Sequence, residues 1–529
     1  MRREVNTWIP RLEGTFLPWA TDLRKYLLDR YPLPSGVHPI PDDVQLPPKW
    51  VLEEVGDSSR AAVEGKAPKH DWETDLRGED NSPHLYRLES DNRPIPDSLT
   101  ATLTQNKRVT PIGHWQDVRH LCLTTPDSIT YAPGDMISIT PKNFSSDVDR
   151  LLAMMGWTDV ADKPVSFVPG VGLRDKSSDE LPPPPLPNLL SSSIHLTLRI
   201  LLTEYLDICA IPRRSVFANI AHYTTDAMHK ERLLEFTNPE YVDEFWDYTT
   251  RPRRSILEVL HEFDTVKIPW QHAATVLPVL RGRQFSIASG GELKRLADGA
   301  EGTKFELLIA IVKYQTVIKR IREGVCTRYL AVLRPGSTLK VQVQRGGLNP
   351  TLQQLLGPSV LIGPGTGLAP LRAMMWEKAG LIKTYQNNHP DKPPPAVGQT
   401  VLVFGGRNRA ADYFFEEEWS RFEQDGLVNL QVLTAFSRDQ RQKVYVQNRI
   451  REQSSLIFRL LHDQAGSVFI CGSSGRMPQA VREALIESFQ QQPPSSGDYM
   501  GDAGLYTREQ AEQYLIGMEK IGRYKQETW

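Results

Sequence analysis

The stretch RGRQFSIASG, residues 281–290, is the segment around which the rest of the chain can be organised. Arg283, Phe285 and Ser286 place a cation, an aromatic ring and a hydroxyl along one short β-like run. A guanidinium pairs with a pyrophosphate, an aromatic ring stacks on a flavin, and a hydroxyl can hydrogen-bond near the reactive edge of that flavin. Taken alone, the run fits an ordinary buried strand better. The flavin interpretation therefore depends on what the remainder of the chain supplies.

Length and composition exclude several classes of protein. The chain of 529 residues is long enough for about three domains. Its 62 basic and 64 acidic side chains give a net charge of -2, unlike the basic balance of a nucleic-acid-binding protein. Four widely spaced cysteines form neither a metal-ligand pattern nor a disulfide framework, and no segment approaches the roughly 20 apolar residues of a membrane span. We therefore expect no metal, no nucleic acid, no membrane span and a cytoplasmic location.

Composition and periodicity divide the chain into four parts. Residues 1–52 look like a linker, and residues 53–97 are rich in charge, Ser, Gly and Pro, as in a disordered connector. Residues 98–352 contain short β-like runs typical of a small antiparallel barrel, with a helical insertion at about 144–276. Over residues 353–529, apolar strands alternate with helices, which predicts a doubly wound parallel sheet. The predicted fold class is multidomain, α+β followed by α/β.

The second predicted domain begins with a glycine-rich loop. The apolar run SVLIG leads into GPGTGLAP, residues 363–370, and a helical pattern follows. Glycines let the backbone approach a pyrophosphate, and a helix N-terminus presents free N–H groups to it. Pro370 suits an early helical position. This order of strand, loop and helix favours a nucleotide-binding loop over a structural turn.

A basic segment, AFSRDQRQKVYVQ at residues 435–447, lies beside a later predicted strand. Ser437, Arg438, Lys443 and Tyr445 supply two cations and two hydroxyls, which a 2′-phosphate on adenosine requires. No acidic residue stands at the approximate position where an NAD site would bind the ribose 2′-OH. With the glycine-rich loop the segment predicts NADPH as the nucleotide, whereas without that loop it would be a solvated charged turn.

Three shorter motifs are compatible with the same chemistry. The strand SVFICG ends with Cys471 and Gly472 and places a thiol at the same sheet edge, although a small buried side chain explains Cys471 equally well. The tetrapeptide GVCT, residues 324–327, can open a helix toward a second phosphate pair. At the end of the chain, the large apolar face of Trp529 needs a cover such as a flavin ring. Glu527 offers a carboxylate that can stabilise positive charge on a nicotinamide.

From about residue 98 to its end, the chain resembles the ferredoxin-NADP⁺ reductase-like half of diflavin reductases, the group that includes cytochrome P450 reductase. The similarity rests on RQFS, GVCT, GPGTGLAP, FGGRNRAADYF, SRDQRQKVYVQ, CGSSGRMP and the terminal Trp, which stand in family order. Within the group, the chain is most similar to the cytosolic branch that delivers electrons for iron–sulfur protein assembly. The finer similarity is carried by YLDI followed by PRRS, RPRRSILEVL, FSIAS, QKVYVQ and ETW.

The resemblance implies a FAD-binding barrel with a helical insertion, followed by a NADP-binding domain, and it assigns site residues. For FAD these are Arg253, Arg283, Gln284, Phe285, Ser286, Gly324, Val325, Cys326, Thr327 and Trp529. For NADPH these are Thr366, Ser437, Arg438, Lys443, Val444, Tyr445, Val446 and Gln447. Ser286, Cys471 and Glu527 would assist hydride transfer, with Glu527 standing where the better-known reductases have Asp.

One assignment has a plainer alternative. Arg253 lies in the second of two PRRS segments, at 212–215 and 252–255. Each segment also fits a Ser that begins a helix, with exposed arginines beside it. This structural interpretation is favoured for the first copy.

The resemblance also implies a path for electrons, from NADPH to FAD, then through FMN to the cluster of an anamorsin-type iron–sulfur protein. Family members carry an N-terminal FMN domain of flavodoxin type, whereas only residues 1–97 precede the predicted barrel here. LEGTFLPWATDLRKYLL resembles the linker that follows such a domain, so we expect a truncated chain rather than one served by a separate flavodoxin. A cytoplasmic location is implied, and association with mitochondria is compatible with it.

Two other functions stay open at this point. One is a flavoprotein with the same donor half but a P450- or sulfite-reductase-type acceptor. The other is a non-catalytic docking module that retained partner binding after losing FMN. The intact FAD and NADPH motifs argue against the second alternative.

Overall fold

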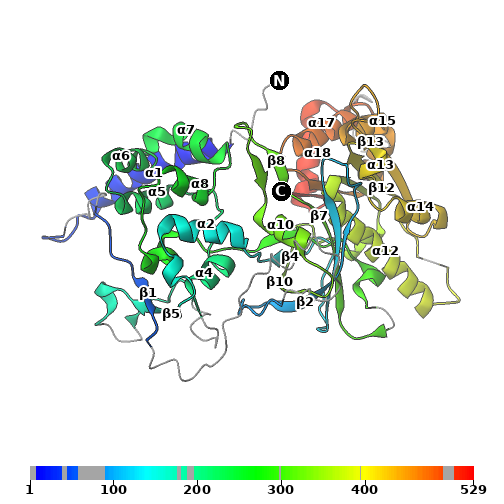
Figure 1. Ribbon diagram of the computed structural model, residues 1–529. Helices are drawn as coiled ribbons and strands as arrows, with labels where there is room; N and C mark the ends of the chain where they lie inside the picture. The colour runs from blue at the N-terminus through cyan, green and yellow to red at the C-terminus, as the bar shows by residue number, and fades with distance from the viewer. Residues whose placement is uncertain are drawn as a thin grey trace.

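The computed structural model describes residues 8–37, 44–56, 90–175, 180–186, 196–296, 299–393, 395–492 and 505–529, with side chains from residue 18 onward. These residues form a helical body, an antiparallel barrel and an α/β body, arranged side by side (Figure 1). The antiparallel barrel with a helical insertion, followed by a doubly wound parallel sheet, is the fold class that the sequence predicts, and the structure confirms it.

The barrel is a six-stranded antiparallel sheet of order β6-β4-β10-β2-β3-β7. An antiparallel bridge between Ile287 and Leu307 joins the two edge strands and closes the sheet. Its interior is filled by alternate apolar side chains, such as Leu121 and Leu123, which are fully buried. The strands are β2 (Leu99–Arg108), β3 (Val118–Thr125), β4 (Met136–Ile139), β6 (Arg283–Ser286), β7 (Thr303–Ala310) and β10 (Thr338–Gln344). Helix α10 (Val325–Val332) packs on the barrel and follows the hairpin of β8 (Lys313–Gln315) and β9 (Ile321–Glu323).

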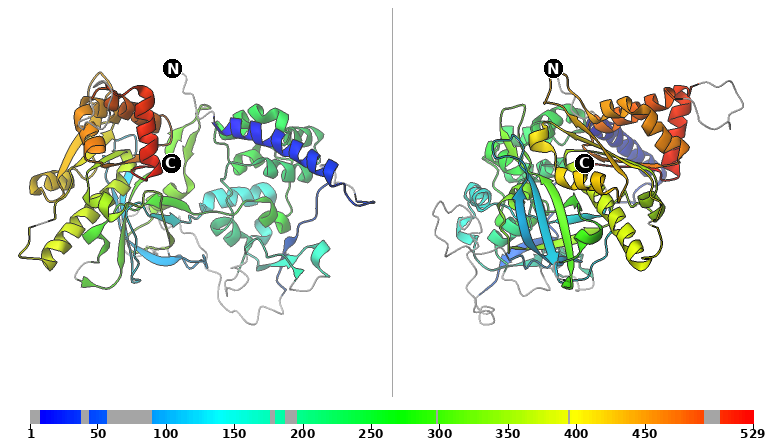
Figure 2. Two further views of the ribbon diagram at one scale, coloured as in Figure 1. Left: turned by 180° about the vertical axis from the view of Figure 1, so that it is seen from behind. Right: turned by 90° about the vertical axis from the view of Figure 1, so that its right-hand side faces the viewer.

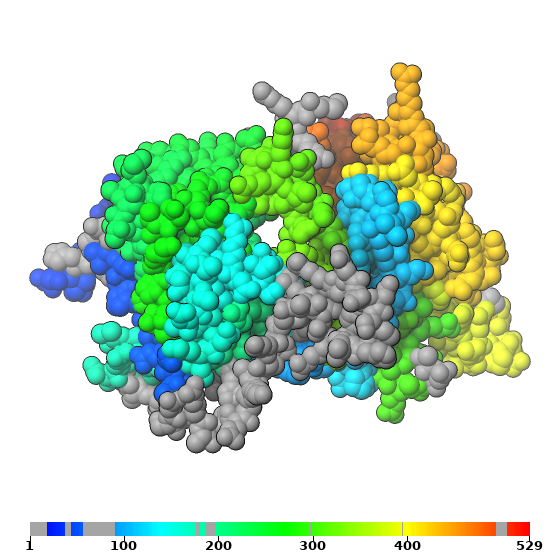
Figure 3. All heavy atoms as spheres, in the orientation of Figure 1, coloured from blue at the N-terminus to red at the C-terminus, as the bar shows by residue number. Residues whose placement is uncertain are grey.

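The helical body has its own apolar core and is formed mainly by residues between β4 and β6, with α1 and β1 added from the chain before the barrel. Its helices are α1 (Trp8–Arg30), α2 (Ser145–Met155), α4 (Leu198–Glu204), α5 (Arg214–Ile220), α6 (Ala227–Glu235), α7 (Val242–Phe245), α8 (Ile256–Glu262) and α9 (Ala273–Val276). A two-stranded sheet of β1 (Trp50–Glu54) and β5 (Val165–Pro169) flanks them. The face of the molecule shown in Figure 3 is hollowed between the helical body and the barrel.

Two interpretations of the N-terminal half need correction. The expected connector at 53–97 is ordered at both described ends, because β1 includes Glu53, and Asp91 forms a buried ion pair with Arg93 at 2.7 Å. Residues 57–89 of that connector lie outside the described residues. The first PRRS segment does not begin a helix with Ser, because Arg213 occupies the cap of α5, whereas Ser255 in the second copy does cap α8.

The α/β body is a five-stranded parallel sheet of order β13-β12-β11-β14-β15. Its central strands are apolar throughout, as in the fully buried run Val401–Phe404, because helices cover both faces. The strands are β11 (Ser359–Pro364), β12 (Thr400–Gly406), β13 (Leu430–Phe436), β14 (Ser467–Gly472) and β15 (Tyr524–Thr528). The short helix α11 (Leu352–Leu356) precedes β11.

Two sets of helices cover the two faces of this parallel sheet (Figure 2). One face packs against α12 (Leu368–Asn388) and α14 (Glu416–Asp425), with α13 (Arg409–Asp412) beside them. The other face packs against α15 (Val446–Glu452), α16 (Ser454–Phe458), α17 (Met477–Gln490) and α18 (Arg508–Lys520). Across the part of the chain that the structure describes, no helix combines the length and apolar character needed to cross a membrane.

Candidate functional site

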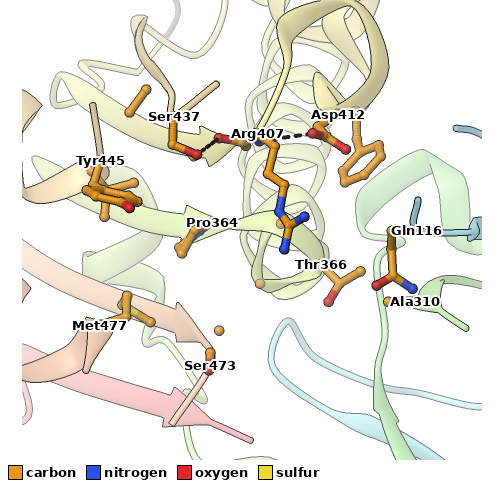
Figure 4. Close-up of a pocket in the computed structure, with 18 of the residues that line it drawn as sticks. Gln116, Ala310, Pro364, Thr366, Arg407, Asp412, Ser437, Tyr445, Ser473 and Met477 are labelled. Carbon is orange, nitrogen blue, oxygen red and sulfur yellow. Dashed lines mark hydrogen bonds between the residues drawn. The ribbon is translucent and has the colours of Figure 1, made fainter. Parts of the chain in front are cut away.

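A cavity of about 800 Å³ lies at the carboxyl ends of β11, β12, β13 and β14 (Figure 4). This edge is where doubly wound sheets bind ligands, at the point where the strand order reverses. Trp115 and Gln116, from the loop between β2 and β3, and Ala310 of β7 complete the wall. The cavity therefore lies between the barrel and the α/β body.

The glycine-rich loop forms the floor of this cavity. Gly365 has a φ of +60°, and nothing lies within 4 Å of a Cβ built there. A Cβ on Gly367 would lie only 2.3 Å from the carbonyl oxygen of Cys471 on the neighbouring strand. Thr366 lines the cavity, and the N-terminus of the 21-residue helix α12 has no side-chain cap. The loop thus fits a dinucleotide pyrophosphate, for which backbone N–H groups and open space are needed.

The predicted adenosine end lies on the next two strands. Ser437, Tyr445, Val446 and Gln447 line the cavity, and the Ser437 hydroxyl donates to the carbonyl of Gly406 at 3.3 Å. Arg438 and Lys443 are exposed on the turn between Ser437 and Tyr445. Their position leaves both cations available to a phosphate at the rim of the cavity. Val444 is different, because its side chain packs into the apolar core of the sheet.

Several residues that line the cavity were not predicted from the sequence. Arg407 follows β12 directly, and its guanidinium lies 3.5 Å from the ring centroid of Trp115. Its place in FGGRNRAADYF, after a strand that ends at the ligand edge, is the signal that could have identified it. Asp412 accepts hydrogen bonds from the Arg407 and Asn408 amides, both at 2.9 Å. It also lies 2.9 Å from His114 of the barrel, a contact that no local pattern predicts.

Of the three residues predicted to assist hydride transfer, Cys471 and Glu527 are brought side by side, whereas Ser286 lies on β6 of the barrel. Cys471 of β14 and Glu527 of β15 are paired in register. Burial raises the pKa of the Cys471 thiol well above its ordinary value, and the charge of Glu527 adds to this rise. Burial, and then the charge of Asp135, raise the pKa of Glu527 to about 7. Asp135 precedes Met136, the cross-strand partner of Ser286, so the charge that acts on Glu527 comes from the segment before β4, the strand paired with β6.

Trp529 stands at the same edge of the cavity. Its amide donates to the carbonyl of Gly472 at 3.0 Å, and its own carbonyl accepts from the Ser474 amide at 3.1 Å. The backbone is therefore fixed while the ring, which lines the cavity, remains 52% exposed. An exposed indole at a cavity edge suits stacking on a planar ring.

The residues predicted to bind FAD gather at one end of the barrel. Arg283 pairs with Asp207 at 3.1 Å, and its charge acts on Cys326 in the first turn of α10. Gln284 donates to the side-chain oxygen of Gln344 at 2.6 Å, and Phe285 packs against the barrel core.

Arg253 is exposed on a turn that lies near the same helix. The neighbouring Pro252 accepts a hydrogen bond at 3.0 Å from Arg322, two residues before Gly324. The arginines at positions 253 and 283 therefore approach α10 from different elements. Tyr314 of β8 is paired with Arg322 and keeps an exposed ring, an aromatic face beside α10 that the sequence interpretation missed.

The first turn of α10 is built to expose backbone N–H groups. Gly324 caps the helix without a side-chain hydrogen bond, and a Cβ there would lie 2.8 Å from the Thr327 hydroxyl. That hydroxyl accepts from the Val312 amide at 3.0 Å, which holds the turn. The Cys326 thiol is buried against the carbonyl of Ile139, and burial raises its pKa to about 12. Residues 324–327 can thus offer their backbone to a phosphate, and the guanidinium of Arg283 supplies the charge.

Comparison with known proteins adds independent findings. The FAD binding domain family matches residues 95–329, and the Oxidoreductase NAD-binding domain family matches residues 361–483. NADPH-dependent diflavin oxidoreductase 1 of Aspergillus fumigatus is 65% identical over 531 residues, covering 100% of this chain and 78% of the relative. The protein of the same name from Emericella nidulans is 64% identical over 520 residues, covering 98% and 76%. The one from Danio rerio is 32% identical over 523 residues, covering 98% and 77%.

Proposed function

The chain belongs to the NADPH-dependent diflavin oxidoreductase family, and on this premise we propose that its electrons reach the cluster of an anamorsin-type iron–sulfur protein through FMN. The FAD-binding and NAD(P)-binding domains make the chain an NADPH-dependent oxidoreductase. The observation that carries the proposal is the cavity at the carboxyl ends of the parallel strands, which the glycine-rich loop at Thr366, the 437–447 segment and Trp529 line together. The choice of acceptor is supported by the sequence resemblance to the branch that serves iron–sulfur assembly.

Bound FAD would supply the chemistry that the side chains lack, namely acceptance of a hydride from NADPH and release of electrons one at a time. The chain would hold FAD by its pyrophosphate, through the first turn of α10 and the guanidinium of Arg283. It would hold NADPH through the backbone at Thr366 and through Ser437, Arg438 and Lys443 at the 2′-phosphate. The ring of Trp529 would cover the flavin and exclude water until the nicotinamide displaces it.

Glu527 would contribute through its negative charge and would not transfer a proton. Its Oε2 atom is buried and has no hydrogen-bond partner among the described residues. As an anion it stabilises positive charge that develops on a nicotinamide as the hydride leaves. Cys471 remains a thiol, because burial beside this carboxylate disfavours the thiolate.

Flavin analysis of the purified chain tests the donor half of this proposal. We expect FAD by extraction, reduction by NADPH in preference to NADH, and turnover with ferricyanide. A colourless chain that cannot be reconstituted with FAD would instead support a non-catalytic docking module.

The acceptor is tested separately, by combining the chain with the FMN-binding domain of a relative. Reduction of a purified anamorsin-type protein is then compared with reduction of a cytochrome P450 and of a sulfite reductase haemoprotein. We expect the anamorsin-type protein to be reduced fastest. Faster reduction of either haem protein would refute the proposed acceptor and favour the alternative flavoprotein function.

A cytoplasmic location follows from the same resemblance. Cell fractionation should place the protein with cytosolic markers, and recovery in a membrane fraction after a high-salt wash would contradict this. An association with mitochondria would appear as a salt-sensitive fraction.

A further inference from the structure

Arg372, on the fifth residue of α12, is a buried cation at the boundary between the barrel and the α/β body. Its side chain is only 2% exposed. Nη1 donates to the Glu306 carboxylate at 2.8 Å and to the carbonyl of Ala288 at 2.9 Å, both in the barrel. Nε and Nη2 donate to the Glu418 carboxylate of α14 at 2.8 and 2.7 Å. One guanidinium therefore joins α12 and α14 to two segments of the barrel.

Arg372 and its three partners, Glu306, Ala288 and Glu418, form what we call the Arg372 network. On the barrel side of this network, the carboxylate of Glu306 makes the most contacts with charged groups. Burial would raise its pKa, but the hydrogen bond from His120 and the charge of Arg372 hold the pKa well below its ordinary value. His120, Cys122 and Glu306 have ligand atoms within 4.8 Å of one another, as in a metal site. However, the Lys304 ammonium is 2.6 Å from the same carboxylate, which already receives Arg372. Two cations on one carboxylate repel a third, so the cluster is an ion-pair network.

A second contact lies next to the Arg372 network and is made by backbone. A Cβ on Gly290 would lie 2.0 Å from the carbonyl oxygen of Ala373, and one on Gly291 would lie 2.2 Å from that of Trp376. The Gly291 amide also donates to the Glu377 carboxylate at 2.8 Å. The barrel segment after β6 therefore touches α12 without intervening side chains.

These contacts lie close, along the chain, to both cofactor sites. Ala288 is separated by one residue from Ser286, at the predicted flavin edge, and Arg372 stands six residues after Thr366 of the nucleotide loop. We infer that the Arg372 network is a positioning device for hydride transfer, which sets the distance between nicotinamide and flavin without touching either. This inference rests on the transfer from NADPH to FAD and is independent of the proposed acceptor.

The expected effect follows from the steep dependence of hydride transfer on distance. Displacement of a reacting group by about 1 Å can slow a reaction about 100-fold. Arg372→Met removes every contact of the guanidinium, and Glu306→Gln removes the charge of its barrel partner while keeping its shape. Both variants should let α12 shift relative to β6.

Lys378→Met is the matched control, because Lys378 lies on the same helix and is also 2% exposed. Its ammonium binds the carbonyl of Gly398 and the hydroxyl of Thr400, at 2.9 and 2.8 Å, both within the α/β body. This substitution therefore perturbs α12 to a similar depth without touching the barrel.

The test uses the full chain loaded with FAD and measures four quantities. These are the stopped-flow rate of flavin reduction by NADPH, the Kd of NADP⁺, the FAD content and the absorbance band of the stacked nicotinamide–flavin pair. In Arg372→Met and Glu306→Gln the rate should fall about 10- to 100-fold and the band should weaken. FAD content should be unchanged and Kd should change less than about twofold. Lys378→Met should keep the wild-type rate and band.

Several results would overturn the inference. If Lys378→Met is slowed as much as the other two variants, burial of a cation in α12 explains the effect. If the Kd of NADP⁺ rises in step with the loss of rate, Arg372 acts in binding.

Arg372→Lys keeps the charge of the side chain without the planar shape of the guanidinium and should recover part of the rate. No recovery would also count against a positioning role. Failure of the wild-type chain to be reduced by NADPH would refute the donor activity itself, which is a distinguishable result.

If Arg372→Met does not fold, Glu306→Gln decides the question, because it keeps the size of the side chain and leaves Arg372 paired with Glu418.

Discussion

Glu527 is the site residue whose charge changes nearest to neutral pH. Its pKa is raised from 4.5 to about 7, first by burial and then by Asp135. Between these two values the folded chain binds more protons than the unfolded chain, so its free energy of unfolding should fall as pH rises from about 4.5 to 7. Above that range the contribution of Glu527 is lost. Urea unfolding at a series of pH values should show this loss in the wild type.

Glu527→Gln is the control, because the amide does not titrate. The difference in unfolding free energy between the two proteins should narrow or reverse across the same pH range, and parallel curves would contradict the assignment. If the anion supports hydride transfer, the rate of flavin reduction should also rise with pH through about 7 in the wild type alone.

Arg438 should discriminate between the two nicotinamide nucleotides. It is exposed beside Ser437, and its amide is fixed by a 2.8 Å hydrogen bond to the carbonyl of Arg407. Arg438→Ala should weaken NADPH binding by about 1.5 to 3 kcal/mol, as for loss of a hydrogen bond to a charged group, and leave NADH nearly unaffected. Titration of both nucleotides measures the difference, and equal losses would remove Arg438 from the 2′-phosphate site.

At the scale of single residues, the sequence predicts those site residues that are adjacent to a strand end. Ser437 and Tyr445 were predicted from their place beside a strand end, and Thr366 from the family resemblance, and all three line the cavity because the carboxyl ends of parallel strands meet at one edge. Trp115 was missed because its contact with the cavity depends on how the barrel packs against the α/β body. No pattern in a single segment carries that information.

At the scale of secondary-structure elements, the segment after β6 passes directly against α12, and Gly290 lies at the point of contact. Gly290→Ala would place a methyl group 2.0 Å from a helix carbonyl, so one element has to move. We expect the free energy of unfolding to fall by about 1 to 3 kcal/mol, as in overpacked cores, together with slower flavin reduction. Urea unfolding and stopped-flow reduction measure the two effects.

Gly517→Ala in α18 is the matched control for that substitution. Nothing lies within 4 Å of a Cβ built at Gly517, and alanine is the better helix former. This variant should be as stable as the wild type or up to about 1 kcal/mol more stable. A similar loss in both variants would show that the contact with α12 is not the cause.

Strand and helix alternation identified the elements of the α/β body, whereas composition misled at the connector. Asp91 and Arg93 stand in a charged, proline-rich stretch, which is typical of a chain without structure. In the fold, Arg93 donates to the carbonyls of Thr140 and Pro141, at 2.6 and 2.8 Å. The partners that make burial of this charge favourable are distant in sequence, so local composition could not reveal them.

At the scale of the whole molecule, the dinucleotide cavity belongs to both the barrel and the α/β body. Binding of NADP⁺ at 100 times its Kd should stabilise the chain by about 2.7 kcal/mol. Trp115→Ala removes a barrel side chain that stacks on Arg407, so it should reduce this stabilisation while leaving the chain without nucleotide nearly as stable. Thermal unfolding with and without NADP⁺ measures both. An unchanged shift would show that the loop between β2 and β3 does not contribute to binding.

The buried pairing of Arg372 with Glu306 also limits how such reductases can be recombined. A chimera joined near residue 353 would bring a foreign nucleotide-binding half against the native barrel. Unless the foreign nucleotide-binding half has an arginine at the position that matches Arg372, Glu306 loses a buried partner, which typically costs about 3 to 5 kcal/mol. The two halves are therefore a matched pair for protein engineering, and successful exchange requires Glu306 and Arg372 to be transferred, or redesigned, together.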